Sequence, residues 1–152
     1  MGIITDRENI KSIVSDLKGQ GKKIVFTNGC FDLIHVGHVR YLAEAKKMGD
    51  VLVIGLNSDD SVSAIKPGRP VIPEGERAEI LSALYMVDYV VLFNEDTPYE
   101  LIKDVQPDVL VKGADWDPMD IIGNDIAKET RTIPFIKGKS TSEIIRMIQA
   151  LK

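Results

Sequence analysis

The chain contains two histidines, His35 and His38, which lie three residues apart with Gly37 between them. They follow a short β-rich apolar run, 22–27, and the turn-forming residues 28–32. A turn between a strand and a helix presents free backbone N–H groups, and the helix dipole adds to their attraction for anions. Two imidazoles presented together can donate hydrogen bonds to phosphate oxygens and stabilise charge that develops there. The cluster therefore predicts a site for phosphate chemistry.

Two other interpretations of this cluster are open. In the first, His35 and His38 are ordinary polar residues at a helix start. In the second, they form a zinc site together with Cys30 and Asp32, which offer the right ligand types. A structural zinc ion usually has four nitrogen or sulfur ligands, but the chain has one cysteine and no further histidine. The dense combination of glycines, histidines and a strand-to-helix turn favours phosphate binding over both.

Strands and helices alternate along the chain. Strands are expected at 22–27, 51–56, 89–93, 109–111 and 132–136. Helices are expected at 6–18, from 38 to near 49, and at 74–86, 98–105 and 141–151. This alternation predicts an α/β fold, a Rossmann-like, doubly wound parallel sheet of five strands. We expect a single domain over residues 1–152, with an N-terminal helix in 1–20 and the α/β core in 22–152.

Ligands bind to such sheets beyond the carboxyl ends of the strands, at the point where strand order reverses. Lys112, Asp115 and Trp116 follow the strand at 109–111 and are expected there. Lys112 can contact a substrate phosphate, and Asp115 can orient a ligand or hold Mg²⁺ through water. Trp116 either packs in the core or stacks on a base. Residues 140–142 begin the last helix, where they either bind phosphate or act only as a helix cap.

Composition excludes several classes of function. The net charge of -4 argues against a general nucleic-acid-binding protein, which needs a basic surface. The single cysteine excludes an intramolecular disulfide. No apolar run approaches the roughly 20 residues of a membrane-spanning helix, and residues 1–16 lack the apolar core of a signal peptide. We expect a cytoplasmic protein that binds neither nucleic acid nor a membrane.

A family resemblance rests on the same motif. The sequence Thr-Asn-Gly-Cys-Phe-Asp-Leu-Ile-His-Val-Gly-His at 27–38 resembles the signature of the cytidylyltransferase-like nucleotidyltransferases, and it is most similar to the adenylyltransferases of ADP-heptose synthesis. The similarity covers nearly the whole chain. It continues through Gly-Leu-Asn-Ser-Asp at 55–59, Arg-Pro-Val-Ile-Pro at 69–73, Glu-Arg at 76–77, Leu-Val-Lys-Gly-Ala-Asp-Trp at 110–116 and Ser-Thr-Ser-Glu-Ile-Ile at 140–145.

The resemblance implies transfer of AMP from ATP to D-glycero-β-D-manno-heptose 1-phosphate, with Mg²⁺ accompanying ATP and no direct protein ligand to the metal. It implies a homodimer. The implied catalytic residues are His35, His38, Lys66 and Arg77. The implied nucleotide-binding residues are Asn28, Gly29, Cys30, Phe31, Gly37, Asn57, Ser140, Thr141 and Ser142. The implied substrate-binding residues are Asp32, Arg69, Lys112, Asp115 and Trp116.

Other functions compete with this one. Glycerol-3-phosphate cytidylyltransferases share the two-histidine motif and use CTP, but they carry Arg-Thr-Glu-Gly-Ile-Ser-Thr where this chain has Phe-Ile-Lys-Gly-Lys-Ser-Thr at 135–141. A non-catalytic nucleotide-binding module is a second alternative, although His35, His38 and Lys66 are all present. A dinucleotide-dependent oxidoreductase is disfavoured, because no Gly-x-Gly-x-x-Gly follows the first strand.

Overall fold

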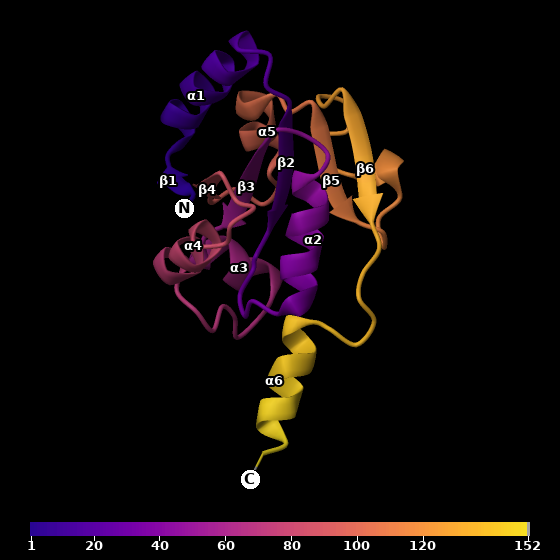
Figure 1. The fold of residues 1–152 in the computed structure, drawn as a ribbon. Coiled ribbons are helices and arrows are strands. Elements are labelled where there is room, and N and C mark those ends of the chain that lie inside the picture. The colour runs from indigo at the N-terminus through magenta and orange to yellow at the C-terminus, as the bar shows by residue number, and fades with distance from the viewer. Residues whose placement is uncertain (152) are drawn as a thin grey trace.

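The computed structural model describes residues 1–151, which form a single parallel sheet of six strands (Figure 1). The strands are β1 (Ile3–Thr5), β2 (Ile24–Gly29), β3 (Val51–Asn57), β4 (Tyr89–Phe93), β5 (Val109–Gly113) and β6 (Glu129–Ile133). Their order is β1-β4-β3-β2-β5-β6. From β2 the chain first adds β3 and β4 on one side and then β5 and β6 on the other. The predicted doubly wound α/β fold is therefore confirmed.

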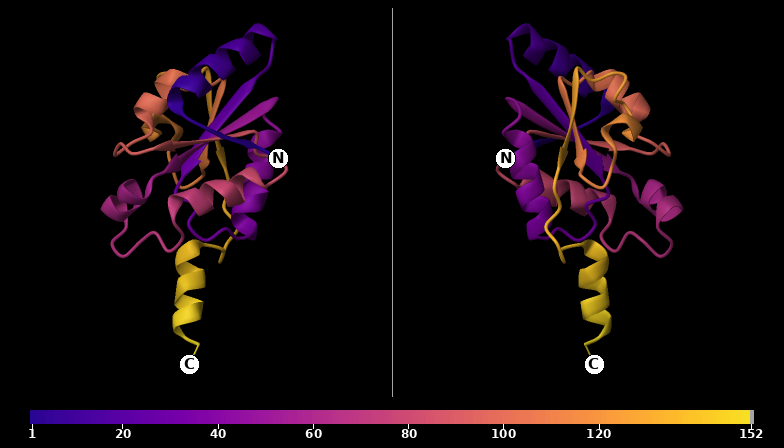
Figure 2. Two further views of the ribbon diagram at one scale, coloured as in Figure 1. Left: turned by 90° about the vertical axis from the view of Figure 1, so that its left-hand side faces the viewer. Right: turned by 90° about the vertical axis from the view of Figure 1, so that its right-hand side faces the viewer.

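Helices cover both faces of the sheet (Figure 2). They are α1 (Arg7–Gly19), α2 (Val36–Lys46), α3 (Asp59–Ile65), α4 (Glu74–Ser82), α5 (Tyr99–Val105), α6 (Thr141–Gln149) and a short 3₁₀ helix, η1 (Pro118–Asp120). Helices α2 and α4 pack on one face, whereas α1 and α5 pack on the other. Because neighbouring residues of a strand point to opposite faces, both faces need apolar side chains. This explains why β3 is buried throughout and carries no polar side chain before Asn57.

The prediction of five strands missed β1. This strand is three residues long and pairs along the edge strand β4, with Ile3 opposite Tyr89. Ile3 and Ile4 stay about half exposed, so β1 lacks the apolar pattern of the inner strands. Position 2, directly before β1, requires glycine, because a Cβ there would lie 2.6 Å from the carbonyl oxygen of Val87.

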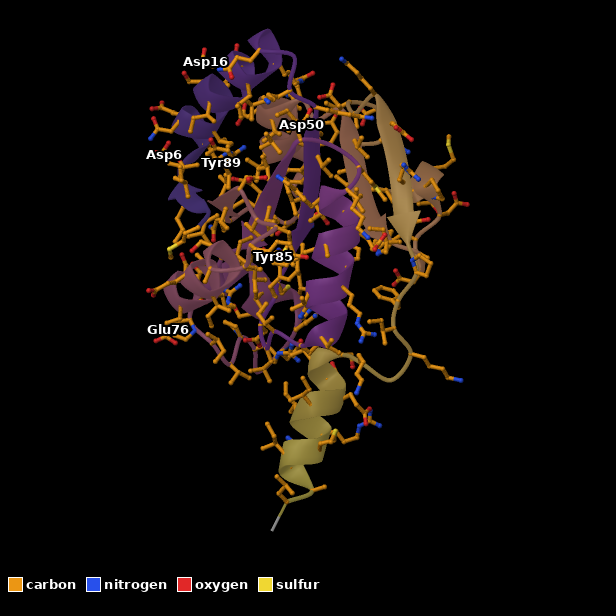
Figure 3. The ribbon with its side chains drawn as sticks, in the orientation of Figure 1. Asp6, Asp16, Asp50, Glu76, Tyr85 and Tyr89 are labelled. Atoms are coloured by element: carbon orange, nitrogen blue, oxygen red, sulfur yellow. The ribbon has the colours of Figure 1, made fainter. Side chains whose placement is uncertain are left out.

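Other boundaries also differ from the prediction. Helix α3 follows β3 directly and is capped by Ser58, whose hydroxyl accepts from Ser61 N–H at 3.2 Å. The sequence had indicated only a turn there. Strand β6 begins at Glu129, three residues before the predicted start at 132. The first residues of this outer strand are polar, so they lack the apolar pattern on which the prediction relied. Asp6, at the start of α1 (Figure 3), caps this helix, because its side chain accepts from Asn9 N–H at 2.8 Å.

The last helix, α6, extends away from the body of the molecule beyond the carboxyl ends of the strands (Figures 1 and 2). Its first turn is tied to the loop before α2, where Thr141 Oγ1 donates to the carbonyl oxygen of Leu33 at 3.1 Å. Across residues 1–151, no helix combines the length and apolar character that crossing a membrane requires.

Candidate active site

A cleft of about 1040 Å³ opens at the carboxyl ends of β2 and β5. These two strands flank the reversal in strand order. The cleft is bounded by the first turns of α2 and α6, by the residues after β5 and by those after β6. It brings together all the residues singled out from the sequence except Asn57 and Arg77. Those that line it are Asn28, Gly29, Cys30, Phe31, Asp32, His35, Gly37, His38, Lys66, Arg69, Lys112, Asp115, Trp116, Ser140, Thr141 and Ser142.

The two histidines form the N-terminal cap of α2. Nδ1 of His35 accepts from Gly37 N–H at 3.1 Å, and Nδ1 of His38 accepts from His35 N–H at 3.3 Å. Their rings stack with centroids 3.8 Å apart and planes inclined by 27°. Glycine is required at position 37, because a Cβ there would lie 2.8 Å from Cε1 of His35. The spacing seen in the sequence thus places both rings side by side at a helix start.

The pKa values of both imidazoles are lowered, which favours their neutral forms. Burial, then His35 and Lys66, lower the pKa of His38 from 6.5 to about 4. Burial, then the positive charge of Lys139, lower the pKa of His35. Each Nδ1 is an acceptor, so each neutral ring carries its proton on Nε2. The pair therefore offers two Nε2–H donors at the positive end of a helix dipole, an arrangement suited to phosphate oxygens.

The turn before the histidines has unusual backbone geometry. Phe31 has a positive φ of 46°, in the left-handed region that side chains other than glycine rarely occupy. Its buried ring lies 5.2 Å from the ring of His38, centroid to centroid. A Cβ at position 29 would lie 2.9 Å from the Phe31 ring, which explains Gly29. Phe31 therefore packs beneath the histidines and shapes the floor of the cleft.

A cationic side chain at the end of β5 and an aromatic one after it line the same cleft as the histidines. Nζ of Lys112 lies 5.8 Å from the ring centroid of Trp116. Burial lowers the pKa of Lys112, while the nearby Cys30 and Asp115 favour its charged form. The ring of Trp116 belongs to the cleft and not to the core, because 45% of this residue is exposed. Lys112 is thus a partly desolvated cation available to an anionic ligand.

A buried hydrogen-bond chain joins the two sides of the cleft. Tyr41 of α2 lies 2.8 Å from Thr27 of β2, hydroxyl to hydroxyl, and Thr27 Oγ1 donates to the carbonyl oxygen of Val111 in β5 at 3.0 Å. Burial raises the pKa of Tyr41 to about 12, so its hydroxyl stays protonated. The chain ties α2 to β2 and β5 across the strand reversal.

Two predicted site residues lie outside the cleft. Arg77 is fully buried, and its guanidinium donates to the carbonyl oxygens of Ile72, Cys30 and Asn57 and to the carboxylate of Asp59, all at 2.7–2.8 Å. The expectation that Arg77 sits beside the phosphates is therefore not met. Asn57 is also buried, and its amide donates to Ser61 at 2.8 Å. Arg77 thus joins the residue after β2 to the end of β3, and Asn57 joins the end of β3 to α3.

The carboxylate of Asp32 also differs from expectation, because it binds the protein and not the open cleft. Its side chain has no exposed area. It accepts from Arg69 Nε at 2.8 Å and from the backbone N–H groups of Val71 and Ile72, each at 2.8 Å from its nearer oxygen. Burial would raise the pKa of Asp32, but these hydrogen bonds outweigh burial and lower it. Asp32 thus holds the loop that carries Arg69.

The start of α6 combines two functions weighed from the sequence. Ser140 is the helix cap, because its hydroxyl accepts from Glu143 N–H at 3.0 Å. Ser140, Thr141 and Ser142 also line the cleft. Capping and a place in the ligand site therefore coincide, as the physics of helix N-termini allows.

Sequence reasoning missed several cleft residues. Arg40, Tyr41 and Glu44 of α2 line the cleft. They recur at helical spacing after Gly37, at positions three, four and seven, so one face of α2 could have been assigned to the site from the motif alone. Phe135 was expected inside a strand at 132–136, but it lies beyond the end of β6, in an irregular segment that lines the cleft together with Lys139.

Similarity to known proteins agrees with this geometry. Residues 26–149 match the model of a family described as cytidylyltransferase-like. The chain belongs to the cytidylyltransferase-like family. The resemblance seen in the sequence is thereby confirmed, and with it the expectation of a nucleotidyltransferase.

Curated relatives agree with this family. The chain is 55% identical over 148 residues to a bifunctional protein HldE of a Nitratiruptor species, covering 97% of this chain and 32% of that protein. It is 50% identical over 147 residues to a bifunctional protein HldE of Wolinella succinogenes, covering 96% of this chain and 31% of that protein. The chain thus spans about a third of the length of these relatives.

Two solved structures share the fold. The lipopolysaccharide core biosynthesis protein from Thermoplasma volcanium GSS1 matches with a TM-score of 0.63 and 30% identity, over 78% of this chain and 100% of that one. Pantoate-beta-alanine ligase from Francisella tularensis, complexed with beta-gamma ATP and beta-alanine, matches with a TM-score of 0.65 over 93% of this chain and 69% of that one. Its identity of 18% makes this a likeness of fold alone.

Proposed function

We propose that this chain transfers AMP from ATP to D-glycero-β-D-manno-heptose 1-phosphate, producing ADP-heptose and pyrophosphate. The observation that carries the proposal is the stacked pair His35 and His38, neutral and with both Nε2–H groups free to donate, at the start of α2. The family match and the relatives named bifunctional protein HldE support the reaction class. The similarity to a lipopolysaccharide core biosynthesis protein supports a sugar as the acceptor.

In the proposed reaction, an oxygen of the sugar phosphate attacks the α-phosphorus of ATP. A new P–O bond forms to the sugar phosphate, and the bond from the α-phosphorus to the bridging oxygen of the β-phosphate breaks. Pyrophosphate leaves with that electron pair. The attacking phosphate is already ionised, so the site needs positioning and charge neutralisation more than a strong base.

The chain's own residues supply both. The Nε2–H groups of His35 and His38 donate to phosphate oxygens on which negative charge increases in the transition state. The lowered pKa values of both rings favour their neutral forms, whose Nε2–H groups act as hydrogen-bond donors. Lys66 and Lys112 line the same cleft and contribute positive charge to the polyphosphate. The hydroxyls of residues 140–142 line the same cleft, where Thr141 is bonded to the loop before α2.

Mg²⁺ is the proposed companion of ATP. Within residues 1–151, no group of three His, Cys, Asp or Glu side chains is arranged to hold a metal ion. In this proposal the ion arrives on the triphosphate. When bound there, the ion supplies neutralisation of phosphate charge.

The test is pyrophosphate release by the purified protein with heptose 1-phosphate and Mg²⁺, with ATP and CTP compared. We expect release with ATP, and a loss of at least about 100-fold in His35→Ala. The matched control is Lys103→Ala, which removes an exposed lysine of α5 that contacts Glu100 and the Tyr99 ring and does not line the cleft; it is expected to keep full activity. Release with CTP and glycerol 3-phosphate alone would transfer the assignment to the cytidylyltransferases. Nucleotide binding with no release would contradict catalysis itself.

A further inference from the structure

Arg69 leaves one polar atom without a partner. Its Nε donates to Asp32, but Nη2 is buried and has no hydrogen-bond partner among the described residues. It is the one buried side-chain polar atom of residues 1–151 in this condition. A buried donor without an acceptor is destabilising, because it has lost its hydrogen bonds to water, so its presence calls for an explanation.

Arg77 provides the contrast within the same protein. It is fully buried, and its Nε, Nη1 and Nη2 all donate to carbonyl or carboxylate oxygens. An arginine with a purely structural role is thus satisfied on all three nitrogens here. Arg69 uses only its Nε, lines the cleft and keeps 12% of its side chain exposed. The unpartnered nitrogen therefore belongs to an arginine in the ligand site.

The position of Arg69 is determined by Asp32. The carboxylate of Asp32 has no exposed area and binds Arg69 Nε together with the backbone N–H groups of Val71 and Ile72. The loop segment 69–72 is thereby fixed by a single buried anion. Asp32 itself follows the left-handed turn at Phe31, so the histidine segment and this loop are joined through one side chain.

We propose that Arg69 is an anion-binding residue whose Nη2 donates to a phosphate oxygen in the cleft, and that Asp32 is the positioning residue that aims it. The proposal rests on the proposed function for the identity of its ligands, but it concerns phosphate binding and not turnover. A guanidinium is suited to this task because it presents planar donors to phosphate oxygens and stays charged. Two sources of the phosphate are available in the cleft, the polyphosphate of the nucleotide and the phosphate of the acceptor.

The experiment is calorimetric binding of pyrophosphate, ATP and inorganic phosphate to the wild-type chain and to Arg69→Lys and Arg69→Met. We expect Arg69→Met to weaken binding of at least one anion by about 10- to 100-fold, as for a hydrogen bond to a charged group. Arg69→Lys keeps the charge but lacks Nη2, and it is expected to recover only part of the loss. Weakening of pyrophosphate and ATP binding assigns Arg69 to the nucleotide, whereas weakening of inorganic phosphate binding alone assigns it to the acceptor.

A double-mutant cycle tests the positioning role. Asp32→Asn is expected to weaken anion binding in the wild-type background but to have little further effect on Arg69→Met, because it acts through Arg69. Thermal unfolding of each variant separates this effect from loss of fold. Unchanged affinity for all three anions in folded Arg69→Met and Arg69→Lys would overturn the proposal. So would additive effects of the two substitutions. Since no turnover is measured, anion binding without nucleotidyl transfer would refute the proposed function and leave this inference standing.

Discussion

The pKa of His38 predicts a specific dependence of stability on pH. Its value of about 4 in the folded chain lies well below its ordinary 6.5. The unfolded chain therefore binds a proton at this ring more readily than the folded chain does. Between pH 6.5 and about 4, unfolding takes up that proton, so stability falls as the pH falls. Above pH 6.5 the ring is neutral in both states and contributes no slope, and below about pH 4 the slope disappears again.

The size of the effect follows from the pKa difference. One unit corresponds to about 1.4 kcal/mol, so His38 accounts for about 3 kcal/mol of stability lost across this range. That is a large share of the 5–15 kcal/mol typical of a domain. His35, whose pKa is also lowered by burial, adds to the loss in the same direction.

The assay is urea unfolding at half-unit steps from pH 7.5 to 4, with the wild type compared with His38→Asn. Asparagine does not titrate, and its Oδ1 can accept the backbone N–H of His35 in place of Nδ1. We expect the free energy of unfolding of the variant to depend less on pH than that of the wild type. The two free energies should therefore approach each other as the pH falls from 6.5. Curves that run parallel through this range would refute the reasoning, because they would show that His38 titrates alike in both states.

Two further substitutions test the geometry of the cleft. Gly37→Ala is expected to lower kcat for pyrophosphate release by about 10- to 100-fold, because its Cβ would lie 2.8 Å from Cε1 of His35 and push that ring aside. Gly75→Ala is the control, because a Cβ there would meet nothing within 4 Å. Equal kcat values in the two variants would count against the argument. Thr27→Val is expected to lower the free energy of unfolding in urea by about 2 kcal/mol, because it leaves the Tyr41 hydroxyl without its partner. Tyr41→Phe is expected to lower it by about 1 kcal/mol, because it removes that hydroxyl altogether. A larger loss in Tyr41→Phe than in Thr27→Val would contradict this hydrogen-bond chain.

The inner strands could be predicted from sequence because the apolar and turn residues that define them are neighbours in the chain. The apolar run at 51–56 is bounded by polar turn residues, and a strand covered on both faces must have that composition. Strand β1 could not be predicted in this way. Ile3 and Ile4 are about half exposed, and the strand gains its pairing from β4, more than eighty residues away. Helix α3 was missed because it follows β3 without an intervening loop.

The site was predictable to a similar extent. The motif at 28–38 and the residues after β5 reach one cleft because the carboxyl ends of parallel strands share an edge. Burial of charge was the part that sequence did not reveal. Arg77 and Asp32 have side chains that suit phosphate and sugar ligands, yet both form hydrogen bonds with backbone groups of the protein. A motif gives residue type and spacing, but only packing shows which polar groups already have partners.

Helix α6 has a consequence for hydrogen exchange. None of its residues 141–149 is buried, and a side-chain hydrogen bond from Thr141 to Leu33 ties its first turn to the body. Opening of this helix therefore exposes little apolar surface, so its amides are expected to exchange much faster than those of α2. A phosphate bound at residues 140–142 would retain the first turn and slow that exchange. The ligand then supplies part of the order of its own binding site, and its affinity is reduced by the cost of that ordering.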